Sequence, residues 1–251
     1  MSEHIQLTMD GSVARLLINN PAQANALDVE ALQAIRAALE QVNASRTVRV
    51  LLLEAEGKYF CSGFNIGKMK PENGGTGFEA TVNMLEDCAP VTIACLEGGV
   101  YGGGTDLALA CDFRLGVADC NMFMPAARLG IHLYGSALRR YVTRLGVDHA
   151  KNLVLTAREA TALQMQQMGY LTHLFDTVEE LRESRDALVR DIAQLAPLSL
   201  KYMKKNINRI ANGQFDADAI GADALLVGAS QDSAEGRLAW REKRRPQFKG
   251  E

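Results

Sequence analysis

The stretch "GGVYGGGTDLALACD", residues 98–112, decides how this sequence is interpreted, because it sets three consecutive glycines against an apolar segment. Gly102 to Gly104 are followed, two residues later, by a single acid, Asp106. Glycine lets another atom approach the backbone without meeting a Cβ. The first N–H groups of a helix are unpaired and lie at the positive end of its dipole. The stretch therefore predicts either an anion-binding helix start or close packing of a helix on a sheet.

Composition limits the classes of protein to which the chain can belong. The 251 residues are 47% hydrophobic and 23% charged, which is ordinary for a globular protein with a full core. A formal net charge of −3 provides no strong field for nucleic acid or anionic lipid. We therefore expect no nucleic-acid partner. No apolar run is long enough to span a bilayer, so we expect no membrane partner either.

Cysteine usage indicates a reducing compartment. The five cysteines are scattered, with no CxxC pair and no paired histidine after any of them. Such a pattern is typical of reduced, buried thiols in a cytoplasmic enzyme, and it does not predict a structural metal site. The first ten residues contain no apolar signal-peptide core. We expect a cytoplasmic location and no metal ligands.

Strand-like runs and a helical pattern alternate in the first two thirds of the chain. We predict strands over residues 12–20, 48–54, 90–98 and 112–119, and a helix over residues 27–42 that Asp28 caps. The unbroken apolar strands indicate a sheet covered on both faces. Alternation of strands and helices with short links is typical of the α/β class.

The last third of the chain has a different residue pattern. From about Ser184 the pattern is helical, with no strand between the helical runs. We therefore predict two parts, an α/β core over residues 1–183 and a C-terminal helical subdomain over residues 184–251.

A second glycine-bearing loop, "GKYFCSGFNIGKM" (residues 57–69), also follows a predicted strand. Two such loops after neighbouring strands can supply two backbone donors to one oxygen. The stretches "FCSGFNI", "PVTIACLEGGVYGGGTDLALACDFRLGVAD" and "SQDSAEGRLAWREKRRPQFKG" resemble the crotonase superfamily of enoyl-CoA hydratases and isomerases. The resemblance covers nearly the whole chain.

The resemblance implies a crotonase-like ββα spiral core and a C-terminal helical subdomain that builds homotrimers, often paired into homohexamers. It implies an acyl-CoA substrate, with coenzyme A present as part of the thioester and no covalently bound cofactor. By position, Phe64 and Gly103 match the two residues whose N–H groups form the oxyanion hole of the family. Such a hole stabilises the thioester oxygen as it gains charge.

The acid–base residues depart from the usual hydratase pattern of two glutamates. The first position holds Asp106, one methylene shorter, which is either a base or a helix cap. The second holds Ala126, which cannot titrate. The nearby stretch "IHLYGS" brings in two candidates. His132 is a general acid or base, or a packed structural histidine, and Tyr134 donates to a carboxylate or an enolate, or only fills space.

The resemblance also implies a coenzyme A site. The residues assigned to it are the loop residues Cys61, Ser62, Gly63 and Ile66 and the basic residues Lys58, Lys68, Lys243 and Lys249. The two C-terminal lysines are expected to act from a neighbouring subunit, and each basic residue is equally compatible with a solvated surface charge. Cys61 is interpreted as a core residue. Arg139 or Arg140, if it faces the acyl end, favours a substrate with a second carboxylate.

Three functions stay open on this pattern. The first is enolate formation for double-bond isomerisation or for hydration by a modified site. The second is decarboxylation of a malonyl-type thioester, which needs no base. The third is a non-catalytic acyl-CoA-binding homologue, because Ala126 and the shortened Asp106 are what loss of catalysis would leave.

Overall fold

The computed structural model describes residues 3–65, 67 and 76–251, and its strands form two sheets. The larger sheet has the order β1-β2-β3-β5-β7-β10, with every pair parallel except the β1–β2 hairpin. Its strands are β1 (Ile5–Asp10), β2 (Val13–Ile18), β3 (Val50–Ala55), β5 (Val91–Leu96), β7 (Phe113–Val117) and β10 (His173–Phe175). The smaller sheet, β4-β6-β8-β9, contains β4 (Tyr59–Cys61), β6 (Gly99–Tyr101), β8 (Asn121–Phe123) and β9 (Ala160–Thr161).

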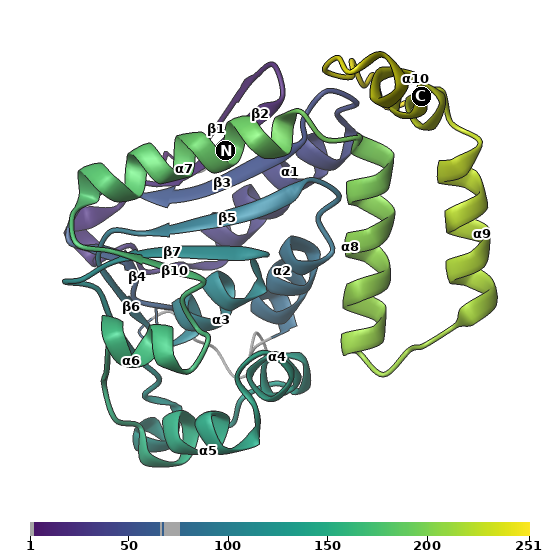
Figure 1. Ribbon diagram of the computed structural model, residues 1–251. Helices are drawn as coiled ribbons and strands as arrows, with labels where there is room; N and C mark the ends of the chain where they lie inside the picture. Colours follow the sequence, from purple (N-terminus) through teal and green to yellow (C-terminus); the bar gives the residue numbers. More distant parts are fainter. Residues whose placement is uncertain (1–2, 66, 68–75) are drawn as a thin grey trace.

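The helices surround these sheets and extend beyond them. They are α1 (Val29–Ala44), α2 (Thr76–Glu86), α3 (Gly103–Ala110), α4 (Gly135–Leu145), α5 (Val147–Thr156), α6 (Ala162–Gln167), α7 (Val178–Ala193), α8 (Pro197–Ala211), α9 (Ala217–Gly228) and α10 (Gln231–Glu242). Short 3-10 turns occupy η1 (Pro21–Gln23) and η4 (Ala126–Leu129). Helices α1, α2 and α3 lie on one side of the larger sheet and α7 on the other (Figure 1).

The core repeats one unit, in which a strand of each sheet is followed by a helix. β3 leads to β4 and α2, β5 leads to β6 and α3, and β7 leads to β8 and, through η4, to α4. This pattern of two strands and a helix confirms the predicted α/β class. The sequence analysis missed β4, β6 and β8, because strands of three residues are too short to show a period.

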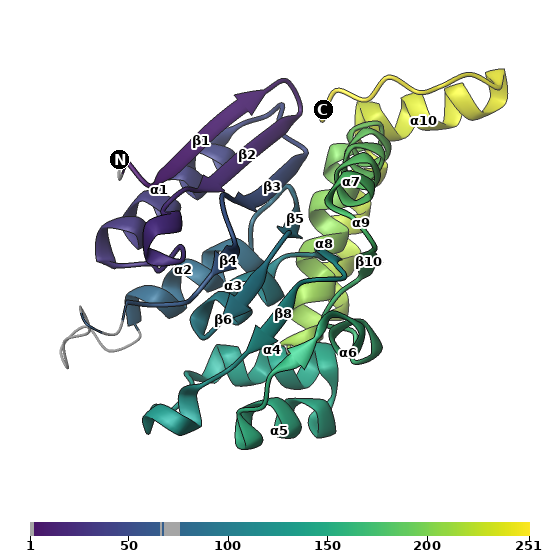
Figure 2. The same cartoon turned by 90° about the vertical axis from the view of Figure 1, so that its left-hand side faces the viewer.

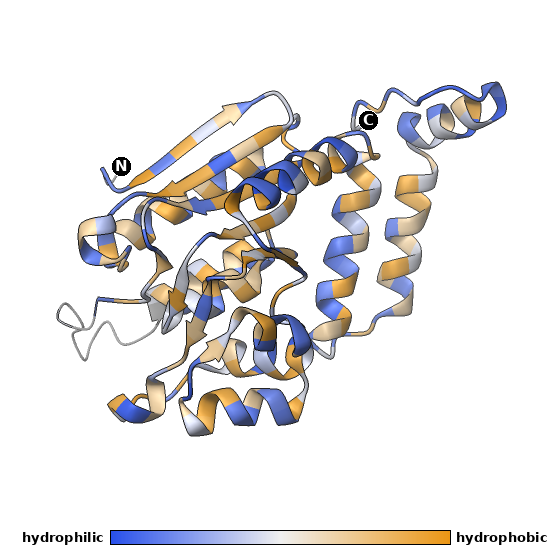
Figure 3. Cartoon of the chain, turned by 60° about the vertical axis from the view of Figure 1, so that its left-hand side comes forward, coloured by the Kyte–Doolittle hydropathy of each residue, from blue (hydrophilic) through white to orange (hydrophobic). Residues whose placement is uncertain are grey.

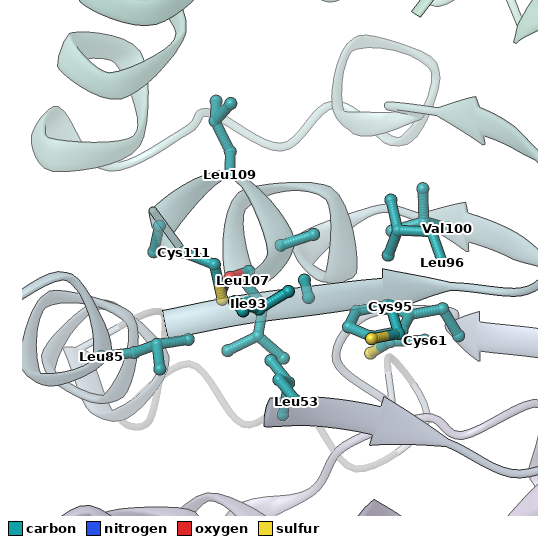
Figure 4. Packing of buried hydrophobic residues seen from close by; sticks show 14 of the residues in the cluster. Leu53, Cys61, Leu85, Ile93, Cys95, Leu96, Val100, Leu107, Leu109 and Cys111 are labelled. Atoms are coloured by element: carbon teal, nitrogen blue, oxygen red, sulfur yellow. Dashed lines mark hydrogen bonds between the residues drawn. The ribbon is translucent and has the colours of Figure 1, made fainter. Parts of the chain in front are cut away.

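The elements that were predicted form where their patterns placed them, whereas β1, α2, α4 and α5 were not predicted. All six side chains of β5 are buried, as expected for a strand covered on both faces. Asp28 caps α1, since its carboxylate accepts from the Ala31 N–H at 3.0 Å. α3 is buried nearly throughout: in Figure 4, Leu109 points to the opposite side of this helix from Ile93 and Leu53.

The C-terminal helices form a separate arm. α8 and α9 run beside each other at the edge of the sheets, and α10 lies beyond them (Figures 1 and 2). No residue of α9 is buried, although Figure 3 colours much of this helix as hydrophobic. The boundary predicted at residue 184 falls inside α7 and stays a prediction. Among the described residues, no helix is both long and apolar enough to cross a membrane.

Candidate active site

The two glycine loops touch each other at the start of α3. A Cβ on Gly63, whose φ is +94°, would lie 2.6 Å from the Gly103 nitrogen. A Cβ on Gly104 would lie 2.5 Å from the carbonyl oxygen of Cys61. Both glycines are therefore required for the close approach of one loop to the other. The three consecutive glycines that raised the first question serve this packing as well as exposing the backbone of the helix start.

The Phe64 N–H is directed away from the neighbouring backbone, and the Gly103 N–H is the first of helix α3. Leu27 makes both bonds of a parallel bridge, donating to the Gly63 carbonyl at 2.8 Å and accepting from the Asn65 N–H at 2.8 Å. The N–H of Phe64, between these two, points away from Leu27, because successive peptides of an extended strand alternate. Within the part of the chain that the structure describes, no hydrogen bond of the Phe64 or Gly103 N–H is recorded.

Asp106 is buried one turn into α3, with 1% of its surface exposed. Its Oδ1 accepts from Arg140 Nε at 2.8 Å, and its Oδ2 accepts from Arg140 Nη2 at 2.7 Å and from the Tyr134 hydroxyl at 2.5 Å. The side chain therefore does not cap α3, whose cap residue, Gly102, has no side chain. A carboxylate offers about four lone-pair sites, so one site on Oδ1 has no partner among the described residues.

Tyr134 and His132, neighbours in sequence, have different surroundings. The Tyr134 ring is half-buried, and burial together with the charge of Asp106 raises the pKa of its phenol far above its ordinary value. Tyr134 is thus a proton-bearing donor at neutral pH. His132 is exposed, and its Nδ1 lies 2.7 Å from the Leu133 carbonyl oxygen. Ala126 is buried at the start of η4.

Arg140 joins Asp106 to helix α2. Its side chain has no exposed surface, and Nη1 donates to Asn83 Oδ1 at 2.8 Å and to Glu86 Oε2 at 3.0 Å. With a longer contact from Nη2 to Ser136 Oγ at 3.4 Å, all five N–H donors have partners. Burial opposes the charge of Arg140, but the bonds and charges of Asp106 and Glu86 outweigh it and raise the guanidinium pKa. Arg140 has no donor left for a substrate carboxylate.

The same contacts show that α2 and α4 face each other through two polar stripes. Glu79, Asn83 and Glu86 lie three or four residues apart on α2, and Ser136, Arg140 and Arg144 lie four apart on α4. The partners are Glu79 with Ser136, Asn83 with Arg140, and Glu86 with Arg139, Arg140 and Arg144. The sequence analysis missed Asn83 and Glu86 as neighbours of the site. Their helical spacing was the available signal.

Phe78, on the first turn of α2, is a second residue that the sequence analysis missed. A Cβ on Gly103 would lie 2.6 Å from the tip of its ring. The ring centroid is 6.4 Å from the Phe64 ring, edge to face, and 6.4 Å from the Tyr134 ring. Phe78 therefore links the two loops to the acid–base pair, and nothing in the sequence alone signals that position.

The residues assigned to coenzyme A are only partly brought together. Cys61, Ser62 and Gly63 lie in the loop that contacts α3, and the exposed Lys58 precedes them with its Nζ 5.5 Å from the Tyr59 ring centroid. Ile66 and Lys68 lie outside the described residues. Lys243 and Lys249 are exposed in the C-terminal segment.

That C-terminal segment lies at the other end of β3 from Lys58. The carbonyl of Phe248 accepts from Arg49 Nη2 at 2.6 Å, just before β3 begins, whereas Lys58 follows the end of the strand. Lys243 and Lys249 are therefore not neighbours of Lys58 within one chain, and their predicted action from a neighbouring subunit is untested.

The buried thiols lack the surroundings of a nucleophile. Burial raises the pKa of Cys61 to about 12, although the Gly63 N–H, which donates to its sulfur, lowers it. A thiol with such a pKa is protonated at neutral pH and reacts slowly. Among the described residues, no group of three or more His, Cys, Asp or Glu side chains is placed to hold a metal ion.

Comparison with known proteins matches the chain over almost its full length. A family model described as "Enoyl-CoA hydratase/isomerase" matches residues 8–251. The chain is 31% identical over 253 residues to the mitochondrial enoyl-CoA hydratase domain-containing protein 2 of Mus musculus, covering 95% of this chain and 84% of that protein. It is 27% identical over 269 residues to the peroxisomal Delta(3,5)-Delta(2,4)-dienoyl-CoA isomerase of Arabidopsis thaliana, covering 98% and 96%.

Solved structures match the fold equally well. An enoyl-CoA hydratase/carnithine racemase from Magnetospirillum magneticum superposes with a TM-score of 0.93, covering 100% of this chain and 97% of that one at 24% identity. At this identity the likeness is informative about the fold, and it confirms the crotonase-like core predicted from the sequence.

Proposed function

The chain belongs to the enoyl-CoA hydratase/isomerase family, and from that premise we propose that it forms an acyl-CoA enolate at the start of α3. The thioester oxygen is held by the N–H groups of Phe64 and Gly103, which have no recorded acceptor among the described residues. Two donors fixed before the reaction stabilise charge on that oxygen without reorganisation. The contact between Gly63 and the Gly103 nitrogen supports this pairing of the loops.

The reaction that these residues support best is movement of a double bond. One carboxylate is sufficient, because it can remove a proton from one carbon of a 3-enoyl thioester and return it to another. Asp106 has one lone-pair site left on Oδ1, and Tyr134 holds a proton beside Oδ2. The contact between Asp106 and Tyr134 is the observation that carries the proposal. The name of the Arabidopsis relative, a dienoyl-CoA isomerase, agrees with it.

Hydration in the usual manner needs a second titratable group, and neither residue 126 nor His132 supplies one. Ala126 has none, and His132 is exposed with its Nδ1 turned to the Leu133 carbonyl. Hydration by this chain would have to use Tyr134 as the second group.

Decarboxylation of a malonyl-type thioester is the second candidate. Its support is the aromatic ring of Phe78 against Gly103, together with the absence of a free donor on Arg140. An apolar site destabilises the carboxylate, and release of CO₂ leaves the bonding electron pair on the thioester as an enolate. No base is required, and a proton from Tyr134 or from water completes the product.

The rest of the substrate site follows from the family. We propose that the loop from Cys61 to Ile66 holds the adenine end of coenzyme A, while Lys58, Lys68, Lys243 and Lys249 meet its phosphates. The two C-terminal lysines require a neighbouring subunit, consistent with a homotrimer or homohexamer. Supporting this assembly, α8 to α10 expose large apolar side chains, including Ile207 at 65%, Leu225 at 78% and Trp240 at 86%.

A cytoplasmic location is proposed on the cysteines alone, all five of which are free and buried. The names of two relatives specify mitochondria and peroxisomes, so fractionation of cells that produce the full chain is the direct test.

The reaction is tested by mass spectrometry of a mixed acyl-CoA panel incubated with the protein in heavy water. The panel holds 2-enoyl, 3-enoyl, saturated and malonyl-type thioesters. We expect deuterium uptake and a shifted double bond in the 3-enoyl compounds. Gain of water would replace isomerisation by hydration, and loss of CO₂ would favour the second candidate. If every thioester returns unchanged, the protein is a binding homologue.

A further inference from the structure

Phe78 lies between the proposed oxyanion donors and Tyr134. Its ring tip touches α3 at Gly103, where a Cβ would come within 2.6 Å of Phe78 Cζ. The ring is 6.4 Å from the rings of both Phe64 and Tyr134, measured between centroids. Phe78 thus spans the gap between the proposed oxyanion donors and the proposed proton carrier.

The first turn of α2 is anchored on both sides of Phe78. Arg36 Nη1, from α1, donates to the Gly77 carbonyl at 3.1 Å and to Thr81 Oγ1 at 2.9 Å. On the other side, Ser136 Oγ, from α4, donates to Glu79 Oε1 at 2.7 Å. Phe78 itself is 6% exposed. These bonds hold both neighbours of Phe78, so the ring is a fixed wall.

The positions of the reacting groups determine how a substrate passes this wall. Asp106 is three residues after Gly103, a rise of about 4.5 Å along the helix. A carbon that exchanges a proton with Asp106 or Tyr134 must come within roughly 3 Å of it. With the thioester oxygen at Gly103, the first acyl carbons therefore run beside Phe78, whose ring touches Gly103 and lies 6.4 Å from the Tyr134 ring between centroids.

We propose that Phe78 is a specificity-determining residue that restricts the substrate to short-chain acyl-CoA thioesters. The proposal rests on the proposed function, because it assumes that the thioester oxygen binds at the start of α3. It names the class of acyl group, which neither the family nor the acid–base residues define.

The test compares Phe78→Leu and Phe78→Ala with the unchanged protein. Two profiles are measured for straight chains of increasing length: kcat/KM for 3-enoyl-CoA thioesters and calorimetric affinity for unreactive saturated acyl-CoAs. We expect the unchanged protein to prefer short chains. The variants should gain about fourfold per added methylene until the vacated space is filled, with the alanine variant extending furthest. Phe175→Leu is the control, because it also shortens an aromatic side chain, and the half-buried ring of Phe175 lies on β10 at the edge of the larger sheet.

The outcomes separate this proposal from the proposed function. If the chain-length profiles of the Phe78 variants parallel that of the unchanged protein, the wall is excluded while enolate chemistry stands. If no thioester reacts but the affinity profile lengthens in the variants, the wall stands and the proposed reaction falls. If the Phe175→Leu profile shifts as much as that of Phe78→Leu, the effect is general loosening and the assignment is overturned.

Discussion

The two ends of helix α3 treat their unpaired backbone groups in opposite ways. At the start, Gly102 offers no side-chain cap and the Gly103 N–H has no recorded acceptor among the described residues. At the end, the Cys111 carbonyl accepts from Arg114 Nη1 at 2.7 Å and from Arg144 Nη1 at 2.6 Å. The positive end of the dipole is left for a ligand, and the negative end is satisfied by two cations. One helix therefore separates a binding end from a structural end.

The largest loss of turnover is expected from adding a side chain at the start of α3. Gly103→Val places side-chain carbon where the nearest atom, Phe78 Cζ, lies 2.6 Å from an ideal Cβ. We expect turnover to fall by about 10²–10³, as for loss of an oxyanion donor, while the protein still folds. Turnover and the thermal midpoint are measured together. Gly221→Val is the control, because a Cβ there meets nothing within 4 Å, and its oligomeric state is compared as well, because α9 belongs to the proposed assembly face. Unchanged turnover in Gly103→Val would remove the oxyanion site from the start of α3.

The second effect compares two carboxylates, Asp106 inside α3 and Asp112 just beyond its end. Asp106→Asn removes the proposed base and leaves the buried Arg140 without its bidentate partner. We expect a loss of about 10² in kcat, at the low end for a general base and no larger than that of Gly103→Val. Stability should fall by about 1–3 kcal/mol, because Arg140 loses one of its two carboxylate partners and keeps Glu86 at 3.0 Å.

The matched variant for this comparison is Asp112→Asn, just beyond the end of α3. Asp112 Oδ2 accepts from the Thr92 N–H at 2.8 Å and lies 2.6 Å from Lys204 Nζ. Its loss should lower the denaturation midpoint while kcat, per folded molecule, is kept. Equal losses of kcat in the two variants would show that Asp106 acts only through stability.

A smaller effect, on stability alone, is expected from removing Arg114 at the C-terminal end of α3. Arg114 is 4% exposed, and burial, with the charge of Arg144 adding to it, lowers its pKa to about 10. It donates to the carbonyls of Cys111 and Tyr170. Arg114→Leu should cost about 1–3 kcal/mol, because the Tyr170 carbonyl loses this donor while the Cys111 carbonyl keeps Arg144, and turnover per folded molecule should be unchanged. Urea titration measures this loss. Arg182→Leu, which breaks an ion pair with Glu97 at a 55% exposed side chain, should cost at most about 1 kcal/mol. A selective loss of turnover in Arg114→Leu would show that the C-terminal end of α3 is not purely structural.

The smallest effect concerns the thiols at the two ends of α3, both of which should be unreactive in the native protein. Burial raises the pKa of Cys61, beside the start of α3, and of Cys111, at its end, to about 12 each. The reactive thiolate appears only as the pH approaches that value, so both thiols are protonated at pH 8. We expect no iodoacetamide adduct on either residue in the native protein and full labelling of all five cysteines in guanidinium, counted by mass. Rapid native labelling of Cys61 alone would indicate an activated thiol at the binding end.

The sequence predicted the parts of the fold that depend on local patterns. The α1 helix with its Asp28 cap, and the apolar β3 and β5 strands, follow from periodicity and composition over six or more residues. The three-residue strands of the smaller sheet do not, because their pairing depends on neighbours far away in sequence. The helical spacing of the polar residues on α2 and α4 is present in the sequence, but only the structure shows that the two polar stripes pair with each other.

For the site, the sequence by itself determined which backbone positions are exposed and which chemistry is missing. Glycines at residues 63 and 102–104 permit the approach of two loops, and alanine at 126 removes one acid–base group. Tertiary structure alone decided the partners of Asp106, the exposure of His132 and the place of Phe78. The reason is physical: glycine and alanine act through what their own backbone or side chain lacks. A carboxylate, an imidazole or a ring acts through whatever the fold places against it.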